Sequence, residues 1–274
     1  MEQAYRGILD GEEDSTVSIE FIQRPFLQME KDTTATEPIT KTRLEIPRKT
    51  TQPYKKLCRI QKLIGQRMSM SKAGKPCFYI EAKADVTDLT AARPMLRKSC
   101  GVKITTNAFY IRALALAAKQ YPLVLGRLDG HNIRIPDNIN VGFAVNAPQG
   151  LVVPVIKRAD TKSLPQTAQM EKLLTEKALS NKLTLQEMED ETIALSNLGV
   201  YGIDSFIGIV PLPASTILAV GNIIQTVDAE KGNLQLRKKV SLTLAADYRV
   251  IDYFLAAKFL GLIKQLLSNF QQLL

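Results

Sequence analysis

The side chains able to carry out chemistry are few in this chain. Its 274 residues include one histidine, His131, and three cysteines, Cys58, Cys77 and Cys100. His131 lies in Leu-Asp-Gly-His-Asn, where aspartate, glycine and asparagine supply the backbone angles of a turn, so we expect a solvated turn residue. These residues make neither a histidine-rich metal site nor a disulfide framework. The sequence therefore predicts no metal site and a reducing compartment.

Other catalytic patterns are also missing. The sequence contains no G-x-G-x-x-G or Walker pattern for phosphate and no G-x-S-x-G for a nucleophilic serine. Cys77 follows Pro76 without a histidine to activate it, and Cys100 ends a predicted helix, so we expect inert thiols. The residues alone therefore identify no catalytic machinery.

The charge is divided unevenly along the chain. The formal net charge is +9, yet residues 1–40 hold nine acidic and three basic side chains, whereas residues 41–75 hold eleven basic ones and the single acid Glu45. Nucleic-acid binding would favour a basic stripe with interleaved aromatics, which this is not. The pattern indicates an acidic tail followed by a basic segment, which is either a solvated face or a subunit contact.

No segment is typical of targeting or of a membrane. No apolar run reaches the ~18 residues that a membrane span needs. The start MEQAYRGILDGEEDS is acidic and lacks the apolar stretch of a signal peptide, so we expect a cytoplasmic protein.

The hydrophobic pattern divides the chain into two parts. Residues 1–55 have no sustained period and contain scattered prolines, which predicts an extended arm or linker, whereas residues 56–274 alternate strands and helices, which predicts one α/β domain. Helices are expected over 59–72, 87–98, 107–121, 163–182 and from 252 onward, with a shorter one after residue 184; strands are expected over 77–86, 139–147, 151–157, 192–196, 216–224 and 240–246.

Capping residues mark several of the helix starts. Thr87 or Asp88 can cap the helix over 87–98. Ser163 and Gln166 have the form of a capping box at the start of the helix over 163–182, and the same signature recurs from Thr184. These side chains predict where the helices begin.

Four segments carry a family resemblance. They are RIQKLIGQRMSMSK with PCFYIEAKADVTDL, NAFYIRALALAAKQYPLVLGRLDG, INVGFAVNAPQGLVVPVIKRADTKSL, and TIALSNLGVYGIDSFIGIVPLPASTILAVG followed by LAADYRVIDYFLAAKFLGLIKQLL. In this order they resemble the catalytic domain of the dihydrolipoamide acyltransferases, the core subunits of 2-oxoacid dehydrogenase complexes, over about residues 56–274.

The resemblance implies a fold and a reaction. The fold would be like that of chloramphenicol acetyltransferase, a mixed sheet flanked by helices, in homotrimers with active sites between subunits and often in larger cages. The reaction moves an acyl group between a lipoyl thiol and coenzyme A. A histidine removes the thiol proton and a serine hydroxyl stabilises the oxyanion.

The family's functional positions are only partly kept. Ser196, in LSNLG, matches the oxyanion-stabilising serine, although a turn serine that bonds backbone groups is the alternative. Arg249 fits the histidine motif, and Asp252 matches the aspartate four residues after the histidine, which makes an ion pair that supports the loop. Tyr248 stands at the histidine itself, because the family's Asp-His-Arg is Asp-Tyr-Arg here.

Two further departures bear on catalysis. Tyr253 replaces the glycine of the motif, and Cys77 replaces the histidine of a Pro-His pair. A free tyrosine has a pKa of about 10, which is far from the value that suits a general base at neutral pH. The resemblance therefore favours weakened or lost catalysis, a pseudoenzyme.

The resemblance also concerns partners. No lysine in an Asp-Lys-Ala turn marks a lipoyl domain, so an acyl group would arrive on another protein, such as another subunit of a 2-oxoacid dehydrogenase-type complex. The tail LLSNFQQLL resembles the segment with which family members dock into a neighbouring trimer, so Phe270, Leu273 and Leu274 are predicted to link trimers, with simple fraying as the alternative.

Three hypotheses remain for the function. The first is a non-catalytic trimeric core protein, analogous to the histidine-less binding-protein subunits of some complexes. The second is an active acyltransferase that uses Ser196 and Tyr248 with coenzyme A and a thiol or another acceptor. The third is a module that binds coenzyme A or acyl-lipoyl groups without turnover.

Overall fold

The computed structural model describes Tyr54 and residues 56–57, 59–230 and 233–274. The extended arm predicted over 1–55 lies outside the described residues except for Tyr54, and so does Cys58, so the arm and the boundary at 55/56 stay predictions. Within the described part, no helix is long and apolar enough to cross a membrane.

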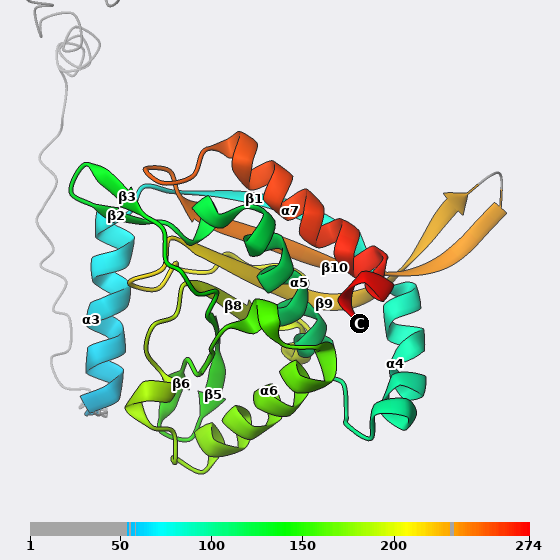
Figure 1. The fold of residues 1–274 in the computed structure, drawn as a ribbon, viewed down its shortest axis with the longest axis horizontal. Coiled ribbons are helices and arrows are strands. Elements are labelled where there is room, and N and C mark those ends of the chain that lie inside the picture. The colour runs from blue at the N-terminus through cyan, green and yellow to red at the C-terminus, as the bar shows by residue number, and fades with distance from the viewer. Residues whose placement is uncertain (1–53, 55, 58, 231–232) are drawn as a thin grey trace, which may run out of the picture. The chain divides into compact units, whose positions relative to one another are not determined.

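A six-stranded mixed sheet forms the centre of the domain (Figure 1). Its strand order is β1-β10-β9-β8-β4-β7, in which β4–β8 and β8–β9 are parallel and the other neighbours are antiparallel. The strands are β1 (Cys77–Asp85), β4 (Val141–Phe143), β7 (Val155–Ile156), β8 (Ile193–Asn197), β9 (Thr216–Glu230) and β10 (Asn233–Asp247). The strand β4 and the first three residues of β8 are buried and carry no polar side chain, as strands covered on both faces do.

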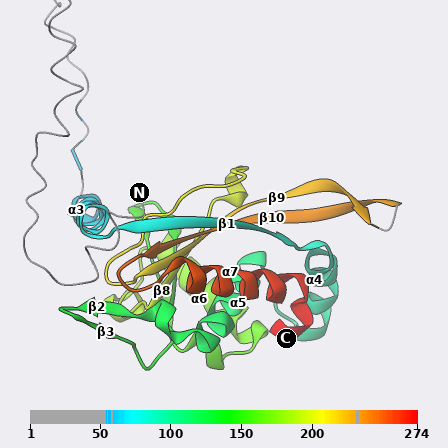
Figure 2. The same cartoon turned by 90° about the horizontal axis from the view of Figure 1, so that it is seen from above.

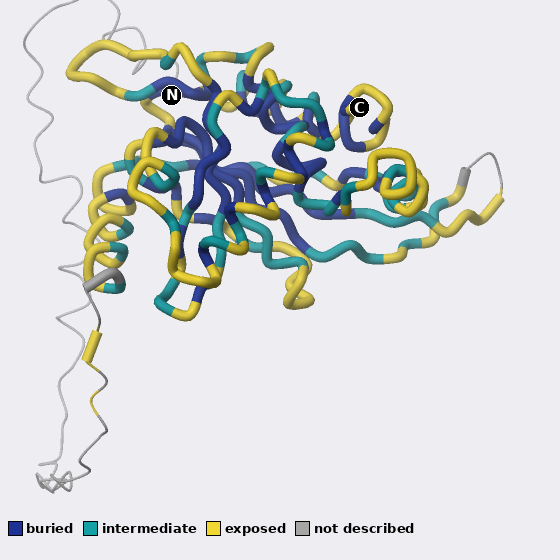
Figure 3. Tube along the Cα trace, turned by 60° about the horizontal axis from the view of Figure 1, so that its bottom comes forward, coloured by how far each residue is buried: buried dark blue, intermediate teal, exposed yellow. Residues whose placement is uncertain are grey.

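Helices pack against this sheet, which confirms the predicted fold class. They are α3 (Arg59–Gly74), α4 (Thr87–Cys100), α5 (Thr106–Gln120), α6 (Leu164–Leu179) and α7 (Tyr253–Ser268). Figure 2 shows α5, α6 and α7 on one side of the sheet, with α7 running along β1. The alanine-rich α5 is buried on nearly all sides, and α7 buries its apolar stripe; Figure 3 shows this buried centre.

Local signals set two of the helix starts. The side chain of Thr105 caps α5 by accepting a hydrogen bond from Ala108 N at 3.0 Å. Ser163 with Gln166 forms the predicted capping box of α6. Both helices therefore begin where a side chain satisfies an otherwise unpaired backbone N–H group.

One helix start and one helix length differ from the prediction. The expectation that Thr87 or Asp88 would cap α4 is wrong, because the N-cap is Val86, which has no capping side chain. Thr87 is already the first helical residue, and its hydroxyl accepts a hydrogen bond from Lys238 N at 2.8 Å, which ties the helix start to β10 instead. The short helix predicted after residue 184 begins as predicted, with Thr184 N donating to Glu187 Oε2 at 3.0 Å, but it is a single 3-10 turn, Leu185–Glu187.

Strand lengths differ from the sequence prediction in two places. The segments expected as single strands over 139–147 and 151–157 are each broken, because β5 (Val145–Ala147) and β6 (Gly150–Val152) leave the main sheet and pair as a separate hairpin. Strands β9 and β10 continue past the expected ends and form a two-stranded arm that projects from the domain in Figures 1 and 2. A smaller hairpin joins β2 (Arg127–Asp129) to β3 (Asn132–Arg134), and the predicted turn residue His131 is exposed there.

Candidate active site

Tyr248 lies in an aromatic cluster at the end of β10. Its backbone N–H donates to the carbonyl oxygen of Pro76 at 3.1 Å, which ties the loop to the start of β1. The ring centroid lies 5.8 Å from that of Phe78 and 5.6 Å from that of Tyr253, and the rings of Phe78 and Tyr253 are 4.2 Å apart. Tyr248 remains 54% exposed, so the cluster holds one side of its ring and leaves the other to solvent.

An ion pair fixes the backbone on either side of Tyr248. The buried Asp247 carboxylate accepts hydrogen bonds from Arg249 Nε at 2.9 Å, Arg249 Nη2 at 2.6 Å and the Arg249 backbone N–H at 3.1 Å. The hydrogen bond to Asp247 raises the pKa of Arg249. This bidentate pair engages Nε and Nη2 of the guanidinium, so Arg249 helps to hold the loop in place.

Asp252 supports the same loop, but not by the ion pair that the resemblance implied. Among the described residues its carboxylate makes no ion pair; Oδ1 accepts a hydrogen bond from Leu255 N at 2.7 Å and caps α7. The position immediately before the first helical turn explains this, because the side chain reaches the unpaired N–H groups there. Asp252 thus holds the start of α7, and its contribution to the site stays a prediction.

Lys75 and Cys77 lie beside this loop. Lys75 Nζ donates to the carbonyl oxygens of Ala214 and, at 3.3 Å, Pro211, and burial lowers the pKa of Lys75. Burial also raises the pKa of the Cys77 thiol. A raised pKa disfavours the nucleophilic thiolate, which agrees with the inert thiol expected at Cys77.

Ser196 lies near the far end of β8. Its neighbour Asn197 donates from Nδ2 to Asn107 Oδ1 at 3.4 Å and accepts from Gly199 N at 2.9 Å. The loop after β8 packs directly on β9. Gly221 of β9 lies so close to this loop that an added Cβ would clash with the carbonyl oxygen of Asp204. The half-buried Ser196 therefore stands beside a loop that glycine allows to approach the sheet closely.

One chain does not bring Ser196 and Tyr248 together. Ser196 pairs with Ala219 of β9, and Ala219 pairs with Thr243 of β10, which is five residues before Tyr248. Two strand spacings and five residues of rise place the two positions about 19 Å apart. A site that uses both side chains therefore needs a second copy of the chain.

The structure also contains a buried acid that the sequence analysis missed. Glu191 is 8% exposed, and its Oε2 has no hydrogen-bond partner among the described residues. Burial raises the pKa of Glu191 to about 7, against the opposing effects of the cations Arg127, Arg67 and Lys75. In the sequence, Asp190 and Glu191 form an acidic pair before a strand, which is typical of a solvated loop. No local signal therefore indicated that Glu191 is buried.

The C-terminal tail is folded onto its own chain, which corrects the exposure expected for it. After α7 a 3-10 turn, Phe270–Leu273, returns the chain towards α5, where the ring centroids of Phe109 and Phe270 lie 6.2 Å apart. Phe270 is 7% and Leu273 0% exposed, and only Leu274 faces solvent. The apolar side chains of Phe270 and Leu273 are buried within their own chain. Docking of these residues into a neighbouring trimer would therefore require the tail to detach.

Comparisons with known proteins agree with this fold. Residues 49–274 match the family model described as 2-oxoacid dehydrogenases acyltransferase (catalytic domain). The mitochondrial pyruvate dehydrogenase protein X component of Mus musculus is 34% identical over 215 residues, 77% of this chain and 43% of that protein. The dihydrolipoyllysine-residue acetyltransferase component of the pyruvate dehydrogenase complex of Rickettsia bellii is 33% identical over 214 residues, 77% of this chain and 51% of that protein. The chain spans about half the length of these relatives.

Solved structures are similar over most of the chain. The dihydrolipoamide acetyltransferase of Azotobacter vinelandii has a TM-score of 0.79 at 30% identity, and the cubic core of a pyruvate dehydrogenase multienzyme complex has a TM-score of 0.80 at 29% identity. Each match covers 87% of this chain and 99% of the other. From the family match, together with the mixed sheet and its helices, it follows that this chain belongs to the 2-oxoacid dehydrogenase acyltransferase family and contains its catalytic domain.

Proposed function

We propose that this chain is an oligomeric core subunit of a 2-oxoacid dehydrogenase-type complex in which acyl transfer is weakened or lost. The observation that carries this proposal is Tyr248. In the Azotobacter vinelandii acetyltransferase a serine, a histidine and an asparagine have a role in the catalytic mechanism, and their residue numbers differ by 52 and then by 4. Ser196 and Tyr248 also differ by 52, and Tyr248 and Asp252 by 4. This spacing supports Tyr248 as the counterpart of the histidine.

The chemistry of a phenol explains the loss. A general base contributes roughly 10²–10⁴-fold to a rate when its pKa lies near the working pH, and a free tyrosine ionises near pH 10. Tyr253 adds a second ring, which packs against Phe78 beside Tyr248. A histidine introduced at position 248 would lie beside the ring of Tyr253, so we expect both Tyr248 and Tyr253 to limit acyl transfer.

Assembly is the part of the proposal that does not depend on catalysis. The separation of about 19 Å between Ser196 and Tyr248 within one chain supports a site formed between subunits. The homotrimer is what the family resemblance implies. A relative with a similar fold forms a cubic core, which supports larger assemblies. Linkage of trimers through Phe270, Leu273 and Leu274 belongs to this proposal and requires the tail to leave its own core.

The decisive experiment is an acyl-transfer assay from acetyl-coenzyme A to dihydrolipoamide. We expect no transfer above the uncatalysed rate for the unmodified chain, partial recovery in Tyr248→His, and more in Tyr248→His combined with Tyr253→Gly. Tyr54→His, at an exposed tyrosine, is the matched control and should stay silent. Rapid transfer by the unmodified chain would overturn the loss of catalysis, and its disappearance in Ser196→Ala would favour an active enzyme instead.

Two further measurements separate the remaining hypotheses. Sedimentation analysis should find trimers or larger particles, and a monomer would contradict the assembly. Calorimetry with coenzyme A tests the binding module, which requires binding without turnover; no heat at millimolar coenzyme A would exclude it.

A further inference from the structure

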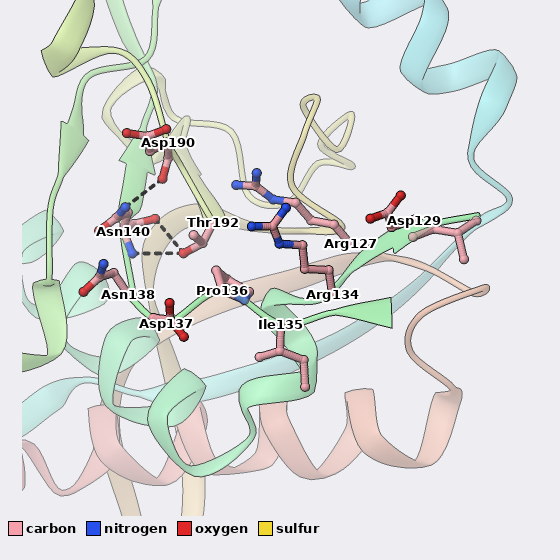
Figure 4. Close-up of a pocket in the computed structure, with 11 residues that line it drawn as sticks. Arg127, Asp129, Arg134, Ile135, Pro136, Asp137, Asn138, Asn140, Asp190 and Thr192 are labelled. Atoms are coloured by element: carbon pink, nitrogen blue, oxygen red, sulfur yellow. Dashed lines mark hydrogen bonds between the residues drawn. The ribbon is translucent and has the colours of Figure 1, made fainter. Parts of the chain in front are cut away.

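The hairpin β2–β3 places two arginines side by side. Arg127 and Arg134 are directly opposite each other in the antiparallel pair. Directly opposite side chains leave the same face of a hairpin with Cβ atoms about 5 Å apart, and like charges there destabilise it. Figure 4 shows both guanidinium groups pointing the same way, towards Asn140 and Thr192. The hairpin therefore concentrates positive charge at one place.

Neither arginine has an ion-pair partner in the described part of the chain, although Arg127 lies close enough to Glu191 to interact with its carboxyl electrostatically. Arg127 Nη2 donates to the backbone carbonyl oxygen of Glu191 at 2.6 Å. Among the described residues, Arg127 Nε is buried without a hydrogen-bond acceptor, and Glu191 Oε2 is buried without a hydrogen-bond donor. A buried charged donor without a partner is unfavourable.

The arginines line a cavity of about 480 Å³, which is large enough for a small molecule. The opposite wall is already bonded internally: Asn140 N donates to Thr192 Oγ1 at 2.9 Å, and Asn140 Nδ2 donates to the carbonyl oxygen of Asp190 at 2.8 Å. The charged groups left for a ligand are the two guanidinium groups and the carboxylates of Asp129, Asp137 and Asp190, of which Asp190 also pairs with Lys157.

We propose that this cavity binds a sugar phosphate, with the phosphate on Arg127 and Arg134 and the sugar hydroxyl groups near Asp129 and Asp137. Two guanidinium groups match the charge and the oxygens of a phosphate monoester. Carboxylates repel an isolated anion but accept hydrogen bonds from hydroxyl groups, which favours a phosphorylated sugar over inorganic phosphate. The cavity lies beside the loop that carries Tyr248, since a Cβ added to Gly126, just before β2, would meet Val250, but it is at the opposite end of β8 from Ser196.

Calorimetry on the full chain tests this assignment with ribose 5-phosphate, inorganic phosphate and ribose as probes. We expect ribose 5-phosphate to bind most tightly, inorganic phosphate more weakly, and ribose not at all. Arg134→Gln should weaken ribose 5-phosphate binding by about tenfold or more, which is the effect of losing a charge-assisted hydrogen bond. Arg134 is chosen because it is exposed, and Arg97→Gln removes the same charge from an exposed position on α4 as the control.

A thermal-denaturation readout distinguishes binding from a structural effect. Without ligand, Arg134→Gln should raise the Tm, because it removes the repulsion between the paired arginines. With ribose 5-phosphate, the Tm of the unmodified chain should rise and that of the variant should not. The proposal is overturned if millimolar ribose 5-phosphate gives no heat, if Arg134→Gln binds it as well as Arg97→Gln does, or if inorganic phosphate binds equally tightly.

Discussion

The buried Glu191 makes the stability of this protein depend on pH. Its pKa is raised from 4.5 to about 7 by burial. Below pH 4.5 the carboxyl is protonated in both the folded and the unfolded chain. Between pH 4.5 and 7 the unfolded chain releases the proton while the folded chain keeps it, so the free energy of unfolding falls as the pH rises. A pKa difference of about 2.5 corresponds to a loss of about 3 kcal/mol, complete above pH 7.

Glu191→Gln should remove this dependence, because an amide of the same size does not ionise. We expect the variant to match the unmodified chain near pH 4.5 and to exceed its free energy of unfolding by up to about 3 kcal/mol at pH 8. Urea denaturation at several pH values and one fixed protein concentration measures the difference. Glu189→Gln, at an exposed acid nearby, is the control and should leave the profile unchanged. Parallel pH profiles for Glu191→Gln and the unmodified chain would refute the reasoning.

Three substitutions test other parts of the structure by the free energy of unfolding from urea denaturation. Leu273→Ala should lower it by about 2–5 kcal/mol, since the side chain is fully buried in its own chain; a loss under about 1 kcal/mol would mean that the tail is not docked there. Asp247→Asn should lower it by about 2 kcal/mol, because the buried pair with Arg249 loses its charge, and an unchanged value would contradict that role. Gly221→Ala should lower it by about 1–3 kcal/mol through the clash with Asp204, and full tolerance would contradict the close packing.

The sequence predicted well those helices whose formation depends on residues that are close together in the chain. The buried α5 follows from its alanine-rich apolar run, and the start of α6 follows from the Ser163 capping box, both of which are readable within a few residues. The outer halves of β9 and β10 were missed because polar side chains such as Asp228 and Lys239 interrupt the apolar pattern, whereas the two strands support each other by pairing across the hairpin.

The parts that sequence analysis could not supply depend on distant segments. The apolar tail indicated a surface to be buried, but only the fold places Phe270 against Phe109 of the same chain. The burial of Glu191 likewise depends on Gly142, which leaves space for the carboxylate, and on cations from other elements. The positions of the candidate site came from a family resemblance, and the register then separated Ser196 from Tyr248.

The loop that carries Tyr248 is held by interactions that do not depend on the side chain at this position. The pair of Asp247 with Arg249 and the cap from Asp252 hold the backbone on both sides of position 248. Neither interaction involves the side chain at 248, so an imidazole there could be exchanged for a phenol without loss of the loop. The phenol even gains contacts with Phe78 and Tyr253. Stability therefore does not oppose the exchange of a histidine for Tyr248 that the proposed function assumes.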